Sequence, residues 1–511
     1  MSPRSLAMLA TCTLLSGCIS PPKIPQATPE QRAEWAKVKT GPFAWGISTS
    51  SYQYEDPDVK PGTPEYFSTD WDILVSQGKA PEKGNALYTW SHFDKDLEAL
   101  KEIGVTHYRF SLEWARIEPK PGVYNEEALR RYVGMARKLK AAGIEPVVCL
   151  WHFTFPDWLY DRRKPGRSNW LHPDFAPRWQ AYVGKVVRAM GPQVRYYAPQ
   201  NEPNGQITTA YIGGMWPPAQ LLNFSNYNKA IDSSAAAFRD AAAIIRRENP
   251  DALVLTVEAL PWWKRSPLHV FSWFWNFMQH TNFDHLDRVY ETADIIGFNY
   301  YYSQVAGPVS MLLIGTHHGK HYTEMGWDID PDALYKQIAF VGDRYGKPIM
   351  ITENGIATAD DNQRITYLEE HIDAVARAMN DGHDVRGYFH WSLADNYEWH
   401  WGYKATFGLA HMNPETFVRE LKPSARVYRG IIQKGAPRVR AVVKLGHHDV
   451  AALHVADLGA GVDAQGTGQH AANPRPGRVD QAAGGDFLDL ARPLVLERGS
   501  PELALAPRGD Q

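Results

Sequence analysis

Short apolar runs alternate with longer segments of helical periodicity from residue 43 to about residue 433. The apolar runs are continuous, which is typical of strands that are buried on both faces of a parallel sheet. Their alternation with helical segments predicts repeated βα units. Eight runs have strand length: residues 43–49, 105–111, 145–151, 194–200, 252–257, 293–299, 348–352 and 385–391.

Amphipathic segments separate most of these predicted strands. In residues 125–142 the apolar positions recur at helical spacing, and Gly143 follows as a stop signal. Similar patterns occur at residues 176–190, 226–248, 331–345 and 365–381. No glycine-rich phosphate loop favours an open, doubly wound sheet, so we predict an α/β fold with a closed (β/α)8 (TIM) barrel as its single catalytic domain.

The first 18 residues have the pattern of an export signal. Arg4 precedes a mostly apolar run at residues 5–15, and Leu-Ser-Gly leads to Cys18. This ending resembles the bacterial lipoprotein box, in which the cysteine is lipidated and becomes the new amino terminus. A transmembrane anchor is the less favoured alternative, because the run is shorter than the roughly 20 residues that span a bilayer. The resemblance implies a cell-envelope lipoprotein, and Ile19 after the cysteine fits outer-membrane sorting towards the periplasm.

Composition also divides the rest of the chain. Residues 19–40 are predicted to be a linker, since residues 19–31 are rich in Pro and Gln. The catalytic domain is then expected over residues 41–436. Residues 437–511 contain one aromatic residue, Phe487, and are dense in Ala, Gly, Pro, Asp and Arg. Such a segment buries too little to fold alone, so we predict a disordered tail, with a small appended module as the alternative.

The overall composition is that of a soluble globular enzyme. Among 511 residues the formal net charge is −3, so the basic excess of a nucleic-acid-binding domain is missing. The three cysteines are Cys12, Cys18 and Cys149, and they form no CxxC motif or His/Cys cluster. We therefore expect no metal and no organic cofactor. Cys149 lies in an apolar run and is interpreted as a core residue.

Two glutamates stand where predicted strands end. Glu353 follows the run 348–352 and precedes an Asn-Gly turn, and Glu202 follows the run 194–200. The carboxyl ends of barrel strands form the face on which barrel enzymes carry their active sites. Two carboxyl groups across one pocket are what cleavage of a glycosidic bond requires. The sequence therefore predicts a retaining β-glycosidase.

Nine motifs near the strand ends resemble, in order, those of glycoside hydrolase family 1, the β-glucosidase family. They include Asn-Glu-Pro at residues 201–203 and Ile-Thr-Glu-Asn-Gly at residues 351–355. The others are residues 43–55, 108–111, 151–152, 299–301, 325–327, 391–399 and 422–425. A single Asn-Glu-Pro is shared by many barrel glycosidases, whereas nine motifs in order over residues 41–433 are specific.

The resemblance implies a role for each matching residue. Glu353 would be the nucleophile and Glu202 the general acid and then the base of a double displacement that releases terminal non-reducing β-D-glycosyl residues. The supporting residues would be Arg109, Asn299 and Tyr301. The substrate-binding residues would be Gln53, His152, Asn201, Trp327, Trp391, Glu398 and Trp399. The implied partner is a small-molecule or oligosaccharide β-glycoside, and no cofactor is implied.

Single residues narrow the implied substrate. Glu398 favours unphosphorylated sugars, because a carboxylate there would repel a 6-phosphate. Glu202 is a carboxylic acid and not the glutamine of thioglucoside-cleaving members, so O-glycosides are expected. Three positions depart from the family pattern: Pro199 before the acid motif, Thr406 in place of an arginine, and Val427 in place of a tryptophan. Pro199 removes a backbone N–H and so puts the local strand pairing in doubt.

Two further segments have alternative interpretations. The aromatic residues between residues 262 and 277 either line the aglycone side of the pocket or pack a helix over the barrel rim. The Arg-Arg-Lys run at residues 162–164 is expected to be a solvated loop, and contact with an anionic aglycone is the alternative.

Two rival functions use the same sequence features. A transglycosylase would use both glutamates to transfer the sugar to a sugar or lipid alcohol. A catalytically silent, glycan-binding envelope lipoprotein is the rival from a different class, and the presence of both Glu202 and Glu353 disfavours it. A family 5-type barrel cellulase is a further alternative, but we would not expect it to carry both the Gln53 and the Glu398 segments.

Overall fold

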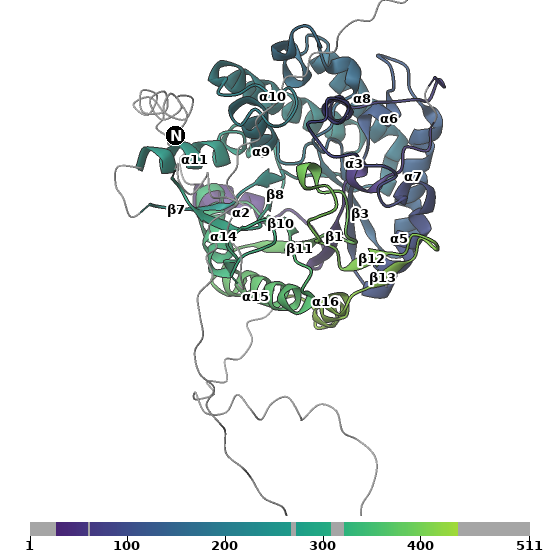
Figure 1. Ribbon diagram of the computed structural model, residues 1–511. Helices are drawn as coiled ribbons and strands as arrows, with labels where there is room; N and C mark the ends of the chain where they lie inside the picture. Colours follow the sequence, from purple (N-terminus) through teal and green to yellow (C-terminus); the bar gives the residue numbers. More distant parts are fainter. Residues whose placement is uncertain (1–26, 60–61, 267–271, 308–320, 438–511) are drawn as a thin grey trace, which may run out of the picture. The chain divides into compact units, whose positions relative to one another are not determined.

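The structure is a computed structural model that describes residues 27–59, 62–266, 272–307 and 321–437 (Figure 1). The predicted signal peptide with Cys18, and residues 438–511 of the predicted tail, lie outside the described residues. Helices surround a central parallel sheet, as Figure 1 shows.

The sheet closes on itself. Its strand order is β5-β4-β3-β2-β1-β11-β10-β8-β6, and the pairings are parallel. The two strands at the ends of this order, β5 and β6, come from one short stretch of chain, so the sheet is a closed (β/α)8 barrel, as predicted. The strands are β1 (Ala44–Ser48), β2 (His107–Ser111), β3 (Glu145–Cys149), β4 (Tyr196–Ala198), β5 (Leu253–Val254), β6 (Glu258–Ala259), β8 (Ile296–Asn299), β10 (Ile349–Asn354) and β11 (Val385–Trp391).

The fifth barrel strand is interrupted, whereas a continuous strand is predicted over residues 252–257. The Thr256 hydroxyl donates to the Gly297 carbonyl and accepts from the Gly297 N–H, both at 3.0 Å. A side chain thus replaces the backbone ladder at this point. A Cβ on Gly297 would lie 2.2 Å from the Thr256 carbonyl oxygen, so this close approach requires glycine.

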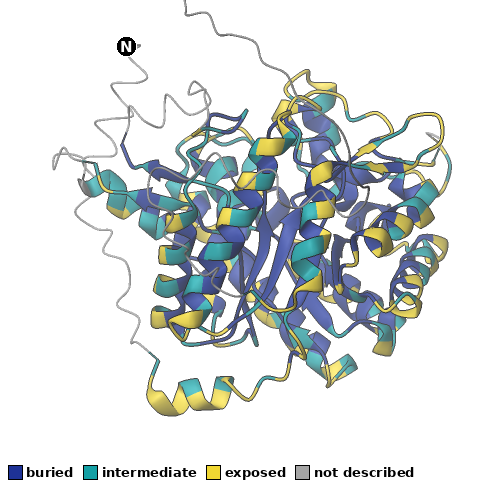
Figure 2. Cartoon of the chain, turned by 90° about the horizontal axis from the view of Figure 1, so that it is seen from below, coloured by how far each residue is buried: buried dark blue, intermediate teal, exposed yellow. Residues whose placement is uncertain are grey.

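The predicted helices form the outer layer. Their buried stripes face the strands and their outer faces are exposed (Figure 2). Asn125 and Asp330 begin two of them as N-caps, accepting from Ala128 N and Ala333 N at 3.0 Å. The long helices are α5 (Thr89–Ile103), α7 (Glu126–Ala141), α8 (Phe175–Met190), α10 (Phe224–Glu248), α14 (Pro331–Tyr345), α15 (Asp361–Asn380) and α16 (Pro423–Gln433). Each of the five predicted helical segments is found within about four residues of its predicted bounds.

Shorter elements lie in the connections. Before the fifth strand these are α3 (Ser51–Tyr54), α4 (Asp70–Ser76), α6 (Trp114–Ile117), η1 (Asp157–Leu159), η2 (Pro165–Arg167), η3 (Asn169–Leu171), η4 (Gly191–Gln193), α9 (Pro203–Ile207) and η5 (Thr208–Ile212). After it come β7 (Trp262–Lys264), α11 (Ser272–Phe283), α12 (Leu286–Val289), β9 (Ser303–Val305), η7 (Trp399–Trp401), β12 (Ala410–Met412) and β13 (Arg419–Leu421). Within the described part of the chain, no helix has the length and apolar character needed to cross a bilayer.

Side chains fill the lower part of the barrel interior. A fully buried cluster draws one residue from each of seven consecutive places around the barrel: Ala44, Val147, Tyr196, Leu255, Ile295, Met350 and Phe389. Gly46 makes room for Phe389, since a Cβ on Gly46 would lie 2.1 Å from that ring. The interior is therefore closed by packing at this level and has space only towards the carboxyl ends of the strands.

The end of the predicted linker is structured, which corrects the prediction of a tether over all of residues 19–40. Residues 29–35 form α2 (Pro29–Trp35), and Thr28 and Gln31 make a capping box. Arg32 donates to the carbonyls of Gly342, at 2.9 Å, and Asp343, at 2.7 Å. The capped helix α2 is therefore held against α14 by Arg32. The Pro-rich composition of this segment does not predict these contacts.

A buried ion pair joins α5 to β13. Asp96 and Arg419 are both fully buried, 2.6 Å apart, and Arg419 also donates to the Leu87 carbonyl at 2.8 Å. Arg419→Met should lower the free energy of unfolding by about 3–5 kcal/mol, because it leaves the Asp96 carboxylate buried without its partner. Urea unfolding followed by fluorescence measures this, with the exposed Arg426→Met as the matched control. Equal midpoints for both variants would contradict the prediction.

Candidate active site

A cavity of about 870 Å³ lies at the carboxyl ends of the barrel strands. All but one of the predicted catalytic and sugar-binding side chains line it: Gln53, His152, Glu202, Trp327, Glu353, Trp391, Glu398 and Trp399. Asn201 is the exception, since it is buried and is not among the residues that line the cavity. The supporting residues Asn299 and Tyr301 also line the cavity, and Arg109 lies beneath it with its side chain fully buried. Residues from six strand ends therefore meet at one site.

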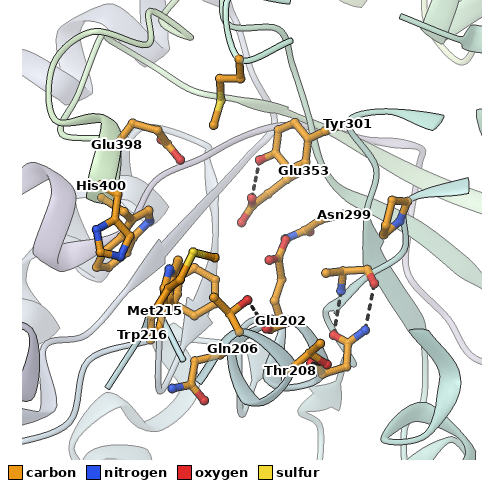
Figure 3. A pocket seen from close by; sticks show the side chains of 18 of the residues that line it. Glu202, Gln206, Thr208, Met215, Trp216, Asn299, Tyr301, Glu353, Glu398 and His400 are labelled. Carbon is orange, nitrogen blue, oxygen red and sulfur yellow. Dashed lines mark hydrogen bonds between the residues drawn. The ribbon is translucent and has the colours of Figure 1, made fainter. Parts of the chain in front are cut away.

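Glu353 is held by two donors at the end of β10. Its carboxylate accepts from the Arg109 guanidinium and, at 2.6 Å, from the Tyr301 hydroxyl, which Figure 3 shows as a dashed line. Burial raises the pKa of Glu353, while the charge of Arg109 and both hydrogen bonds act to lower it. A buried carboxylate that accepts from a cation and from a hydroxyl is stabilised in its ionised form.

Glu202 lies just after β4 in a different environment. Its backbone has φ 45°, in the left-handed region that is uncommon for residues other than glycine, and its N–H donates to Val257 O at 2.7 Å. Asn299 donates to its carboxyl group at 2.7 Å. Burial, followed by the negative charge of Glu353, raises the pKa of Glu202 to about 8. Glu202 is therefore protonated at neutral pH.

A hydrogen-bond network joins the two glutamates. Arg109, which binds Glu353, also donates to the Asn201 side-chain carbonyl at 2.6 Å. Asn299, which donates to Glu202, lies 3.4 Å from the same Asn201 oxygen. The two carboxyl groups are thus fixed relative to each other through three intervening side chains. Buried networks of this kind order their members into one geometry.

His152 adds a neutral imidazole ring to this network. Its Nε2 lies 3.2 Å from the Asn201 amide nitrogen, and its Nδ1 is buried with no protein partner. Burial, followed by the charge of Arg109, lowers the pKa of His152 well below its usual range, so the ring is neutral. If Nε2 accepts from Asn201, the proton is on Nδ1.

Gln53 and Glu398 form a second polar group on the opposite wall. The Gln53 amide donates to Glu398 at 3.2 Å and to the Tyr397 carbonyl at 2.9 Å. Burial, followed by the charges of Glu353 and Glu202, raises the pKa of Glu398 to about 8. Next to it, Trp399 stacks on Tyr52 with ring centroids 5.6 Å apart. An acid–amide pair beside flat aromatic rings suits a sugar ring with its hydroxyl groups.

Several lining residues could not be found from sequence motifs. Trp216, Met215, Gln206 and Thr208 come from the segment after Glu202, and Figure 3 shows them on the Glu202 side of the cavity. Part of this segment is the π-helix η5, and such turns are frequent at functional sites. No motif marks these residues, because the loops of a barrel vary while its strand ends keep their pattern.

Both interpretations of the aromatic segment at residues 262–277 are partly right. Trp263 lines the active-site cavity, whereas Trp262 and Trp275 line a separate cavity of about 130 Å³. Strand alternation explains the division at β7, since neighbouring side chains point to opposite faces. Phe271 lies outside the described residues. The Arg-Arg-Lys run at residues 162–164 is not among the residues that line the described active-site cavity.

Pro199 does not disturb the pairing that positions the acid. β4 ends at Ala198, one residue before the proline, and Leu150 N donates to Ala198 O at 2.9 Å. Pairing resumes when Asn201 N donates to Trp151 O at 2.9 Å.

Among the described residues, no group of three or more His, Cys, Asp or Glu side chains could hold a metal ion.

A closed (β/α)8 barrel with two networked, buried glutamates at its carboxyl face defines a barrel glycoside hydrolase. Comparison with known proteins agrees. The sequence profile described as "Glycosyl hydrolase family 1" matches residues 38–269 and 275–436. The chain therefore belongs to glycosyl hydrolase family 1.

Individual relatives resemble the chain over most of their length. A bifunctional β-D-glucosidase/β-D-fucosidase of Bifidobacterium breve is 32% identical over 467 residues, which cover 78% of this chain and 98% of the relative. A β-galactosidase of Sulfolobus acidocaldarius is 29% identical, covering 76% and 94%. The crystal structure of a β-glucosidase from Pyrococcus furiosus superposes with a TM-score of 0.69 at 26% identity, covering 78% and 97%.

The raised pKa of Glu202 has a consequence for stability. Between about pH 4.5, where the unfolded side chain titrates, and about pH 8, the folded protein keeps a proton that the unfolded chain has lost. Stability from this group therefore falls as pH rises through that range. Glu202→Gln removes the effect and should be more stable than the parent by about 2–5 kcal/mol at pH 8.5, with the gain shrinking towards pH 4.5.

Unfolding midpoints at a series of pH values measure this difference. The exposed Glu415→Gln is the matched control and should follow the parent. If the stability difference between Glu202→Gln and the parent does not change with pH, Glu202 titrates as an ordinary glutamate and the prediction is wrong.

Proposed function

We propose that this protein hydrolyses terminal β-glycosidic bonds of O-glycosides with retention of configuration, with Glu353 as nucleophile and Glu202 as acid and base. One observation carries the assignment of roles. Two buried glutamates share a network, yet one is bound by Arg109 and Tyr301 while the other has a pKa of about 8. Double displacement requires one ionised and one protonated carboxyl group at the start of the cycle.

In the first step the ionised Glu353 oxygen attacks the anomeric carbon and forms a bond to it. The bond from that carbon to the aglycone oxygen breaks, and Glu202 gives its proton to this oxygen, so the aglycone leaves as a neutral alcohol. The Tyr301 hydroxyl, 2.6 Å from Glu353, orients the attacking carboxylate. The neutral His152, which lines the cavity, binds a sugar hydroxyl.

In the second step a water molecule attacks the same carbon and Glu353 leaves as a carboxylate. Glu202 now takes the proton from water. Its change of role follows from electrostatics, because Glu353 is a neutral ester in the intermediate and its charge no longer raises the pKa of Glu202. The acid of the first step thereby becomes a carboxylate base for the second. Two inversions at one carbon give net retention.

The sugar is proposed to be an unphosphorylated glucosyl, fucosyl or galactosyl residue. The named relatives are a β-glucosidase/β-fucosidase and a β-galactosidase. Glu398, whose carboxyl group lies beside Gln53 on the cavity wall, supports this choice because an acidic group, and not a basic side chain that would pair with a phosphate, occupies that place. The residues that hold the sugar are proposed to be Gln53, His152, Asn201, Trp327, Trp391, Glu398 and Trp399.

Transfer to an alcohol other than water is the second candidate. A chloroplastic galactolipid galactosyltransferase of Arabidopsis thaliana is 26% identical over 430 residues. The same two glutamates serve either reaction, since only the attacking hydroxyl differs. Chromatography of products formed with an added alcohol separates transfer from hydrolysis. The catalytically silent glycan-binding role has no support in the site, where both glutamates are held in place.

The protein is further proposed to be a lipoprotein of the bacterial cell envelope, anchored through Cys18 in the outer membrane and facing the periplasm. Support comes from the Leu-Ser-Gly-Cys sequence after a short apolar run and from the Pro- and Gln-rich residues that follow.

Glu353→Gln should lower kcat for 4-nitrophenyl β-glucoside by about 10³-fold or more, because an amide does not form the covalent intermediate. Glu202→Gln should lose more activity on alkyl glucosides than on 2,4-dinitrophenyl β-glucoside, whose leaving group needs no proton. Glu415→Gln is the control for both. Parent-like turnover by Glu353→Gln would refute the proposed nucleophile.

Metabolic labelling with a fatty acid tests the anchor. The full chain, expressed in a Gram-negative host, should incorporate label and fractionate with membranes, whereas Cys18→Ala should do neither. Cys12→Ala is the matched control and should behave as the parent does. Label that persists in Cys18→Ala would end the lipoprotein hypothesis.

A further inference from the structure

The outer part of the cavity is where the aglycone must lie. Glu202 protonates the glycosidic oxygen in the proposed function, so the group attached to that oxygen extends beyond Glu202 and away from Gln53 and Glu398. This outer wall comes from α9, η5, β7, α11, η7, the segment after η5 and the segment after α4. Its residues are Lys79, Gln206, Thr208, Thr209, Met215, Trp216, Trp263, Met278, Thr281, Asn282 and Trp401.

The hydroxyl groups of the outer wall are already bonded inside the protein. Thr208 donates to Asn204 O at 2.7 Å and Thr209 donates to Gly205 O at 2.8 Å. Thr281 donates to Met278 O at 3.0 Å. Each hydroxyl hydrogen therefore points back into its own helix and is not offered to the cavity.

The amide side chains are bonded in the same way. Gln206 accepts from the Trp170 indole at 2.9 Å and donates to the Pro217 carbonyl at 3.1 Å. Asn282 accepts from the Trp263 indole at 3.0 Å and donates to the Pro261 carbonyl at 2.9 Å. A second sugar bound here would lose water from its hydroxyl groups and find few free partners, which is costly.

What the outer wall presents is apolar surface. Met215 is 57% exposed and Trp401 is 37% exposed at the mouth, and both are among the few large hydrophobic side chains that the described surface exposes. Trp216 and Met278 also line the cavity, and Trp216 contacts the rings of Trp399 and Phe153. The three carboxyl groups that line the cavity, by contrast, belong to Glu202, Glu353 and Glu398.

We propose that this outer wall is a binding site for an apolar aglycone, an alkyl or aryl-alkyl chain, and that it selects such glycosides over those with a second sugar. Flexible methionine side chains and tryptophan rings suit a chain of variable shape. Lys79, which also lines the cavity, is exposed to solvent. The inference rests on the proposed function, because Glu202 defines which side of the cavity receives the aglycone.

The test is kcat/KM for methyl, butyl, hexyl and octyl β-glucosides and for cellobiose, measured with the full chain. Partial burial of the alkyl chain should raise kcat/KM by about twofold per added methylene. Octyl β-glucoside should therefore exceed methyl β-glucoside by about 100-fold, and cellobiose by on the order of 10-fold or more. A flat alkyl series, or cellobiose at or above the octyl glucoside, would overturn the proposal.

A variant at the cavity mouth tests whether the outer wall causes the dependence of kcat/KM on alkyl chain length. Met215→Ser should lower the octyl-to-methyl ratio of kcat/KM by about threefold, since it removes an apolar contact at the mouth. Val123→Ser is the matched control, because Val123 is 54% exposed and does not line the cavity. An unchanged ratio in Met215→Ser would contradict the assigned wall. Absence of turnover with every glycoside, including 4-nitrophenyl β-glucoside, would instead refute the proposed function.

Discussion

The pairing of Glu353 with Arg109 is the interaction on which the site depends. A carboxylate buried at the end of a barrel strand would take up a proton without a cation beside it. Arg109 is fully buried, and its guanidinium group donates to Glu353 through one nitrogen and to Asn201 through another. The negative charge kept on Glu353 in turn helps to hold a proton on Glu202. One ion pair thus sets opposite protonation states on two similar side chains.

The barrel brings these groups together. Arg109, Asn299 and Glu353 lie on β2, β8 and β10, which are distant in sequence, and Glu202 follows β4. Parallel pairing aligns their carboxyl ends at one rim, while packing around Phe389 and Tyr196 closes the interior below them. The rim groups are therefore held by strands, and the aglycone wall is built from the connections between them. The strand ends therefore fix the catalytic groups, while the connections determine which aglycone binds.

The strands, the main helices and both glutamates could be predicted because continuous apolar runs and strand-end motifs are local signals. Other features depend on contacts between distant residues. The break in the fifth strand follows from Thr256 bonding to Gly297, and the order of residues 28–40 follows from Arg32 reaching α14. The outer wall around Met215 arises from loop packing and a π-helix, and no sequence period marks either.

Trapping the covalent intermediate tests the central claim most directly. A 2-deoxy-2-fluoro β-glucoside with a good leaving group should inactivate the enzyme and leave one fluorosugar on the protein, since the fluorine slows both steps while the leaving group keeps the first step fast. Mass spectrometry of peptides should find that sugar on Glu353. A fluorosugar on Glu202 or Glu398, or turnover without any labelled protein, would contradict the double displacement proposed for this site.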